Sequence, residues 1–297
     1  MKRTLKWALA VLSTLLLLAL AVAGTGLLLE QRRLARRVDI PVPPLNIPTD
    51  TRALVRGQYL FESRGCTDCH GMAGEGRLMA KADGLTLAAP DITQGGSTRE
   101  YTPDDWMRAV RHGVAPGGRP LRVMPSEDYN RLTDADLGAL VAYVRALPAA
   151  GGAAAVVELP LPARVLYGWG LVNDAVDRID HRLPPQAPVP EGATVEHGRY
   201  VAQGCVGCHG PGLAGGRIPG APPDWPAAPR LASGDGSVMP RYADPAAFRA
   251  LMKSGRRPDG SAVAVMPFEA LARLSDVDLQ ALHLYLGTAQ DGGTGAR

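Results

Sequence analysis

The sequence predicts an all-α protein in which one membrane-spanning helix precedes two copies of a duplicated helical domain. Three observations lead to this prediction. A run of 23 uncharged residues, Trp7 to Leu29, is long enough to cross a bilayer. Two long segments of the remaining chain repeat the same landmarks in the same order. Apolar residues recur there at helical spacing, and no long stretch shows the alternation of a β-strand.

Composition and charge narrow the classes of function. The 297 residues suffice for two ordinary domains, and 35 Gly with 26 Pro predict short helices joined by long loops. Four cysteines are too few for a disulfide-rich scaffold. Residues 1–37 hold seven basic residues and one acid, whereas the rest of the chain has 25 basic and 28 acidic residues. That remainder has no basic excess, so we expect no nucleic-acid partner.

Residues 1–37 are predicted to form a transmembrane anchor with basic flanks. The apolar run would span about 34 Å, against a hydrocarbon core of about 30 Å. A cleaved signal peptide is the main alternative, because Ala21-Val22-Ala23 resembles a cleavage site, and a buried soluble helix is a more remote one. We favour a retained anchor because signal peptides usually have an apolar region of only about 7–15 residues. Basic residues flank both ends, so they do not settle the orientation.

The chain beyond the anchor is a repeat. Segment 56–77 is echoed by 197–217, and segment 123–147 by 265–286. Two matched landmarks at nearly the same separation indicate a duplicated domain. The predicted divisions are a Pro-rich tether (38–49), a first domain (50–148), a connector (149–189) and a second domain (190–297). In the connector, apolar residues on one face predict a single amphipathic helix that fixes the two domains relative to each other: Val165, Trp169, Val172, Val176 and Ile179.

Each repeat is expected to contain three main helices. The first leads into a cysteine motif, over 51–63 and 193–202. The second follows Thr102-Pro103 or Asp244-Pro245, where proline suits the first helical turn. The last begins at Thr133 or Ser275, each followed three residues later by an aspartate, in a pattern similar to a capping box.

Two Cys-x-x-Cys-His motifs carry the chemistry and use all four cysteines. They are Cys66-Thr67-Asp68-Cys69-His70 and Cys205-Val206-Gly207-Cys208-His209. Cysteines three residues apart lie on the same side of a helical turn, where each can form a thioether to a haem vinyl group while the adjacent histidine reaches the iron. A zinc site and a thioredoxin-like dithiol are the alternatives. We favour haem c because zinc would need ligands from motifs 139 residues apart, and a dithiol would need a strand–helix unit.

A sixth iron ligand is predicted from the repeat. Met124 and Met266 stand at equivalent places, and proline follows each. A thioether is a soft, neutral ligand that favours ferrous iron, as suits an electron carrier. A core-filling role for these methionines is the alternative, and Met239 is a second candidate in the later copy. His112 could instead provide a second histidine ligand, but the later copy has Ser254 there.

Pro90 and Pro229 form a further matched pair, each 20 residues after its motif histidine. A backbone carbonyl near that point could accept the proton from the other ring nitrogen and orient the histidine. Alternatively, the prolines could simply form a wall of the haem pocket.

These features resemble class I c-type cytochrome domains, and the whole chain is similar to membrane-anchored dihaem cytochromes c and cytochrome subunits of bacterial respiratory chains. The matching features are Gly-x-Tyr before Cys-x-x-Cys-His-Gly, Met-Pro before the final helix, and Leu-[Ser/Thr]-Asp-x-Asp-Leu opening it. The chain also resembles cytochrome subunits of membrane-bound alcohol or aldehyde dehydrogenases, which commonly carry three such motifs. The resemblance implies an all-α fold around each haem, His/Met ligation and one-electron transfer. It also implies haem attachment outside the cytosol, and hence a bacterial cytoplasmic membrane protein with its haem domains in the periplasm.

We therefore expect an electron-transfer protein with two covalent haems and no substrate chemistry of its own. It would relay electrons between a periplasmic dehydrogenase and a soluble cytochrome or terminal oxidase. A dihaem enzyme, such as a peroxidase or small-molecule oxidoreductase, is the alternative, and it would need an open distal position on one iron. A methionine in both copies argues against that alternative.

Overall fold

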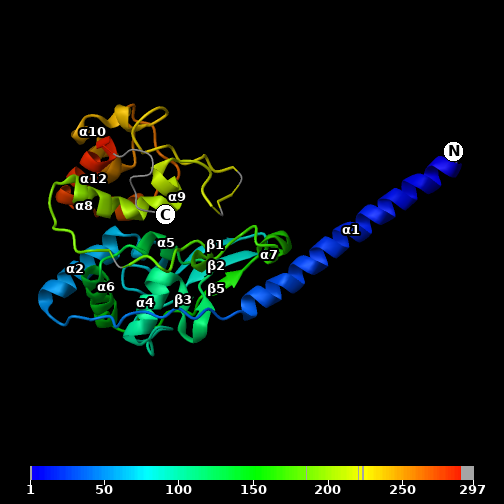
Figure 1. Ribbon diagram of the computed structural model, residues 1–297, viewed down its shortest axis with the longest axis horizontal. Coiled ribbons are helices and arrows are strands. Elements are labelled where there is room, and N and C mark those ends of the chain that lie inside the picture. Colours follow the sequence, from blue (N-terminus) through cyan, green and yellow to red (C-terminus); the bar gives the residue numbers. More distant parts are fainter. Residues whose placement is uncertain (1, 185, 220, 223, 289–297) are drawn as a thin grey trace.

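The computed structural model describes residues 2–184, 186–219, 221–222 and 224–288, so part of the predicted second domain, residues 289–297, lies outside the described residues. Two lobes lie one above the other, and a long helix projects away from the lower one (Figure 1). This helix, α1 (Lys2–Ala35), contains the whole apolar run, and its length and composition would allow it to cross a membrane.

The predicted helices are present in both lobes. The first lobe contains α2 (Thr51–Ser63), α3 (Cys66–His70), α4 (Pro103–His112), α5 (Ser126–Tyr129) and α6 (Asp134–Ala146). The second contains α8 (Val195–Val201), α9 (Val206–His209), α10 (Pro245–Ser254), α11 (Phe268–Leu271) and α12 (Asp276–Thr288). Short 3-10 turns accompany them: η1 (Pro116–Gly118), η3 (Ala202–Cys205), η4 (Pro211–Leu213) and η5 (Met239–Tyr242).

Capping and close packing explain these helices. The Thr102 hydroxyl accepts from the Asp105 amide and the Asp105 carboxylate accepts from the Thr102 amide, which makes a full capping box at α4. Helix α2 packs against α6 at Gly57, where a Cβ atom would lie 2.0 Å from the Ala139 carbonyl oxygen. Helix α8 packs against α12 in the same way at Gly198, where the Cβ would lie 1.9 Å from the Ala281 oxygen. In each lobe, one pair of helices therefore packs so closely that only glycine fits at the point of contact.

The all-α prediction is wrong for the first lobe. A three-stranded antiparallel sheet joins β1 (Arg77–Ala82), β2 (Leu85–Ala89) and β5 (Val156–Glu158) in the order β1-β2-β5. A small hairpin pairs β3 (Val114–Ala115) with β4 (Arg119–Pro120). Asp83 and Gly84 turn the first hairpin with positive φ angles of 46° and 81°, the backbone for which Asp-Gly is favoured in tight hairpins. That dipeptide is a local signal in the sequence, whereas the pairing of β5 is a long-range contact.

Residues 38–49 are extended, but they do not form a free tether. Ile40 is buried against Val114 and Val176, and Leu45 is buried in the core of the first lobe. The Ile40 carbonyl also accepts a 3.2 Å hydrogen bond from Arg108 Nε. The alternating apolar side chains of this segment give it a buried face, so it binds along the first lobe instead of acting as a spacer.

The connector also differs from the prediction of one long amphipathic helix between the lobes. Helix α7 (Leu161–Gly168) ends early, and a separate 3-10 turn, η2 (Ala175–Asp177), follows. Gly170, with φ 73°, ends α7: its amide and that of Leu171 donate back to the carbonyls of Tyr167 and Leu166. Helix α7 packs against the end of α1 instead of between the lobes (Figure 1).

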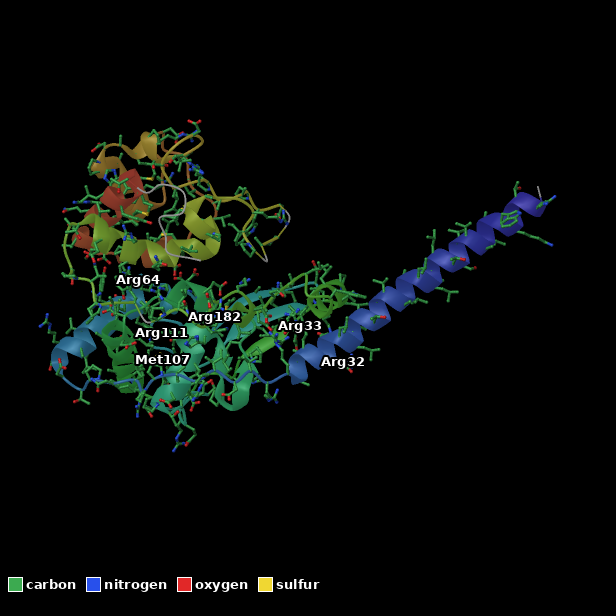
Figure 2. The ribbon with its side chains drawn as sticks, viewed as in Figure 1. Arg32, Arg33, Arg64, Met107, Arg111 and Arg182 are labelled. Atoms are coloured by element: carbon green, nitrogen blue, oxygen red, sulfur yellow. The ribbon has the colours of Figure 1, made fainter. Side chains whose placement is uncertain are left out.

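An approximate two-fold relationship joins the lobes. Tyr59 of the first lobe donates to Asp278 of the second at 2.6 Å, and Tyr200 of the second donates to Asp136 of the first at 2.6 Å. Such reciprocal contacts characterise an interface between two equivalent copies. Arg64, at the boundary between the lobes in Figure 2, adds a 2.9 Å ion pair to Asp278.

Candidate haem-binding site

Both motifs adopt nearly the same backbone. The first motif is the single helical turn α3, whereas the second begins at Cys205, the end of η3, and continues on α9. Glycine ends both turns, at Gly71 and Gly210, with φ angles of 75° and 73°. The amides of Gly76 and Gly215 return to the carbonyls of His70 and His209, both at 2.8 Å. The sequence therefore places two cysteines and a histidine within one short helical segment in each lobe.

The motif histidines are oriented by the predicted prolines. His70 Nδ1 lies 3.0 Å from the Pro90 carbonyl oxygen, and His209 Nδ1 lies 2.8 Å from that of Pro229. Burial lowers the pKa of both histidines and outweighs these hydrogen bonds, which raise it. The imidazoles are therefore neutral at neutral pH, and Nδ1–H donates to the carbonyl. This leaves the lone pair on Nε2 free to bind a metal.

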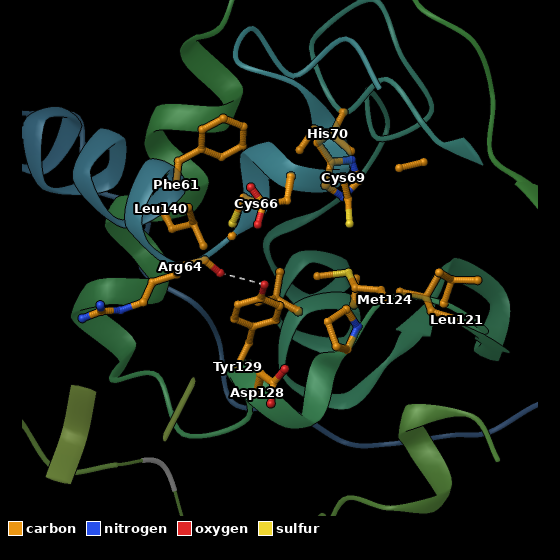
Figure 3. Close-up of a pocket in the computed structure, with 18 of the residues that line it drawn as sticks. Phe61, Arg64, Cys66, Cys69, His70, Leu121, Met124, Asp128, Tyr129 and Leu140 are labelled. Atoms are coloured by element: carbon orange, nitrogen blue, oxygen red, sulfur yellow. Dashed lines mark hydrogen bonds between the residues drawn. The ribbon is translucent and has the colours of Figure 1, made fainter. Parts of the chain in front are cut away.

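A cavity of about 790 Å³ opens beside the first motif. Cys66, Cys69 and His70 line one side, and Met124 lies opposite them with its side chain directed toward the cavity (Figure 3). The intervening walls are mainly apolar, with Phe61 and Leu140 among them. This volume and lining suit a large, flat, mostly apolar cofactor held by cysteines on one side and by histidine and methionine from two sides.

The second lobe repeats the methionine geometry at Met266. The carbonyls of Met124 and Met266 each accept a 2.9 Å hydrogen bond from the amide two residues later, and Pro125 and Pro267 share closely similar φ and ψ angles. Met266 is partly buried against the core of the second lobe. Met239 is buried in that core, but it begins the 3-10 turn η5, which has no counterpart in the first lobe.

Each motif packs against the other lobe at the lobe interface. Cys205 and Cys208 of the second motif line the same cavity as the first motif. Helix α5 of the first lobe packs against α9, and α11 of the second lobe packs against α3. Asp128 of α5 accepts a 2.8 Å hydrogen bond from the Gly207 amide within the second motif. The motifs are therefore neighbours in space although 139 residues separate them.

The structure argues against the other readings of the cysteines. Burial raises the pKa of Cys66 and of Cys205 to about 12, whereas a redox-active dithiol needs a lowered thiol pKa. Zinc would need a closed set of four ligands. Within the part of the chain that the structure describes, no three His, Cys, Asp or Glu side chains come together as one would require.

His70 is the histidine that lines this cavity; His209 and Met266 are not among its lining residues, and neither are the four histidines outside the motifs. His112 Nδ1 lies 3.0 Å from His181 Nδ1, and burial beside that ring lowers the pKa of His112 to about 4. His283 Nε2 contacts the Tyr242 carbonyl at 2.7 Å. His197, which the sequence did not mark as special, lies 2.7 Å from Asp278 at the lobe interface. Sequence reasoning also missed Asp128 and the tyrosine–aspartate pairs, whose only signal is that tyrosine and aspartate recur in both repeats.

Comparison with known proteins identifies the two repeats. The family described as cytochrome c oxidase, cbb3-type, subunit III matches residues 52–144 and 193–286, together more than half of the chain. The chain is 30% identical over 170 residues, or 52% of its length, to the gluconate 2-dehydrogenase cytochrome c subunit of Pantoea cypripedii. It is 26% identical over 274 residues, or 83% of its length, to the fructose dehydrogenase cytochrome subunit of Gluconobacter japonicus. It is 29% identical over 270 residues, or 80% of its length, to the cytochrome c subunit of a quinone-dependent alcohol dehydrogenase from Gluconobacter oxydans.

The chain spans 37%, 54% and 55%, respectively, of the length of these relatives. The two matched regions coincide with the two lobes and their motifs, and the cavity fits the cofactor of such domains. The protein accordingly binds two covalently attached haems c. The chain belongs to the cytochrome c oxidase, cbb3-type, subunit III family.

Proposed function

We propose that the protein is the electron-transfer subunit of a dehydrogenase system and relays single electrons through its two haems. Cys66 and Cys69 hold the first haem, with His70 and Met124 as iron ligands. Cys205 and Cys208 hold the second, with His209 and Met266 as ligands. The bound haem iron supplies reversible one-electron chemistry. The carbonyls of Pro90 and Pro229 keep the two histidines oriented through their Nδ1 protons.

A single observation supports the relay best. The cysteines of both motifs line one cavity at the lobe interface, so an electron arriving at one haem has a short path to the other. Electron tunnelling weakens steeply with distance, and two one-haem domains on a flexible linker would not hold such a path. The paired tyrosines and aspartates hold the lobes together at this point.

The electron donor is proposed to be a dehydrogenase outside the cytosol, and the acceptor a soluble cytochrome or terminal oxidase. Three relatives are named as cytochrome subunits of dehydrogenases, which supports the donor class. Helix α1 would hold the protein in the bacterial cytoplasmic membrane with both lobes in the periplasm, because haem c is attached there. A positioned methionine in both copies supports electron transfer over catalysis at an open iron.

Substrate-driven reduction tests this function. Membranes that contain the protein are supplied in turn with gluconate, fructose or ethanol, and reduction is followed in the haem α-band. We expect at least one substrate to reduce both haems of this chain, and membranes with Cys69→Ala and Cys208→Ala together to lose that signal. Consumption of hydrogen peroxide by the purified reduced protein, with no response to any dehydrogenase substrate, would instead indicate a dihaem peroxidase.

A further inference from the structure

Helix α7 and the turn after it, residues 161–172, lie against the end of α1. A Cβ atom on Gly168 would lie 1.9 Å from the Gly26 carbonyl oxygen, so the two backbones touch. Trp169 Nε1 donates to the Val22 carbonyl at 3.2 Å. Arg164 pairs with Glu30 at 2.8 Å, and Glu30 is only 3% exposed. Segment 161–172 therefore covers one side of α1 from Val22 to Glu30.

This contact reaches into the apolar part of α1. Val22 and Gly26 precede Glu30 by eight and four residues, or about 12 Å and 6 Å along the helix axis. Both belong to the uncharged run that ends at Leu29. The environment of α1 between Val22 and Glu30, whether lipid or water, must therefore also be the environment of the outer face of segment 161–172.

The outer face of segment 161–172 is itself apolar. Its only charged residue is Arg164, which is paired with Glu30. Leu171 is 72% exposed, and other large apolar side chains of the segment are also more than a third exposed: Leu161, Leu166, Trp169 and Val172. Exposing these side chains to water costs free energy. They form an apolar surface that is continuous with the exposed leucines of α1.

Both segments change from apolar to charged at the same level. On α1 the charges begin at Glu30 and continue through Arg32 and Arg33, and Arg36 directly follows the helix. Figure 2 shows Arg32 and Arg33 at this end of α1. On the connector, after the paired Arg164, they begin at Asp174. Arg36 bonds Asp174 and Asp177 at 2.7 Å, and Arg33 bonds Asp177 at 2.9 Å. The two segments thus form one unit with a shared boundary between its apolar and charged parts.

We propose that residues 161–172 insert beside α1 into the outer leaflet of the membrane, at the boundary between lipid headgroups and acyl chains. This inference rests on the proposed anchoring role of α1. Tryptophan is favoured at that depth, and the ion-paired layer above it meets the headgroups. A second contact with lipid stops the first lobe from swinging on α1. It holds the first haem site at one orientation to the membrane surface, which the bound segment 38–49 also supports.

Spin labelling of the full-length, haem-loaded protein tests this insertion. One nitroxide is placed at Leu171→Cys or Leu166→Cys, since the four native cysteines are consumed by the haems. Gln280→Cys, exposed on α12 in the other lobe, is the matched control. In phosphatidylcholine vesicles, relaxation by oxygen, which concentrates in acyl chains, is compared with relaxation by a water-soluble nickel chelate.

We expect oxygen to relax the labels at 166 and 171 several-fold more effectively than the nickel chelate, with the opposite order at 280. The opposite order at 166 and 171 in vesicle-bound protein would overturn the proposal and would leave this face to a protein partner. Failure of the full-length protein to remain with the vesicles would overturn the anchor itself, and this inference with it. The two failures are therefore distinguishable.

Discussion

Tyr59 of the first lobe donates a 2.6 Å hydrogen bond to Asp278 of the second, where the Asp278 carboxylate is fully buried. The same tyrosine hydroxyl accepts from the Ser275 amide at 3.0 Å. The equivalent residues make the same two hydrogen bonds in the opposite direction across the interface. Tyr200 of the second lobe donates to Asp136 of the first and accepts from the Thr133 amide at 3.3 Å. Helix α2 leads directly into the first motif, and α8 into the second. These contacts therefore set the separation between the two haem sites.

Removing one tyrosine hydroxyl should loosen the interface. Tyr59→Phe and Tyr200→Phe each leave a buried carboxylate with one donor fewer, so we expect each to lower the free energy of unfolding by about 1–3 kcal/mol. Urea unfolding followed by circular dichroism measures this change. Tyr143→Phe is the control, because its hydroxyl makes no hydrogen bond within the described residues. A loss no larger than that of the control would contradict the prediction.

The contribution of Asp278 should depend on pH. Burial alone would raise the pKa of Asp278, but the Arg64 charge and the hydrogen bonds from Tyr59 and His197 outweigh it, so this pKa lies below its ordinary value. Such an acid adds stability above its unfolded pKa of about 3.9 and loses it as the pH falls through the lower folded pKa.

We therefore expect Asp278→Asn to lower the free energy of unfolding by about 3 kcal/mol at pH 7, and by much less in strong acid. Urea titrations at neutral and strongly acidic pH provide the comparison. Asp276→Asn, whose side chain is 62% exposed, should have little effect at either pH. An equal loss for Asp278→Asn under both conditions would exclude this linkage.

Replacing one proposed methionine ligand should change the reduction potential of one haem and leave that of the other unchanged. Met124→His and Met266→His should each lower one reduction potential, because imidazole favours ferric iron more than a thioether does. A change of tenths of a volt lies within the roughly 0.8 V that axial ligands span. Spectroelectrochemical titration measures both potentials, and Met239→His should leave both unchanged. If Met239→His shifts a potential and Met266→His does not, the ligand in the second lobe is Met239.

The two helix crossings should not tolerate a methyl group. At Gly57 and Gly198 a Cβ would lie about 2 Å from a backbone oxygen of the facing helix, which cannot move aside as a flexible side chain could. Alanine at either position should cost about 1–3 kcal/mol of stability. Gly287→Ala is the matched control: it lies in α12, no atom of the described residues lies within 4 Å of the added methyl, and it should stabilise the protein by up to about 1 kcal/mol. Thermal unfolding of the three variants shows whether their effects have opposite signs.

The mature protein should keep its apolar N-terminus. The uncharged run is longer than the apolar region of a typical signal peptide, which has about 7–15 residues. Its end also packs against α7 in the connector. N-terminal sequencing and intact mass of the purified protein determine where the mature chain begins. A chain that starts at Gly24 and is recovered in the soluble periplasmic fraction would identify a cleaved signal peptide.

Much of the helical framework could be predicted from sequence because its signals are local. Thr102, Thr133 and Ser275 cap the helices that they were expected to begin, because a hydroxyl acts on an amide three residues away. The hydrogen bonds of His70 and His209 to prolyl carbonyls followed from one spacing repeated in both copies. The duplication made this prediction possible, because a spacing that recurs in both copies arises by chance less often than one seen once.

The sequence by itself determined the two motifs, the repeat, the order of the main helices and an N-terminal helix apolar enough for a membrane. Each of these depends on residues that are close along the chain. Only the tertiary structure decided that Val156–Glu158 completes a sheet, that Ile40 is buried, and that α7 lies on α1. It also decided that Tyr59 meets Asp278. These contacts join residues far apart in the chain, and the same side chains could have been satisfied by water or by other partners.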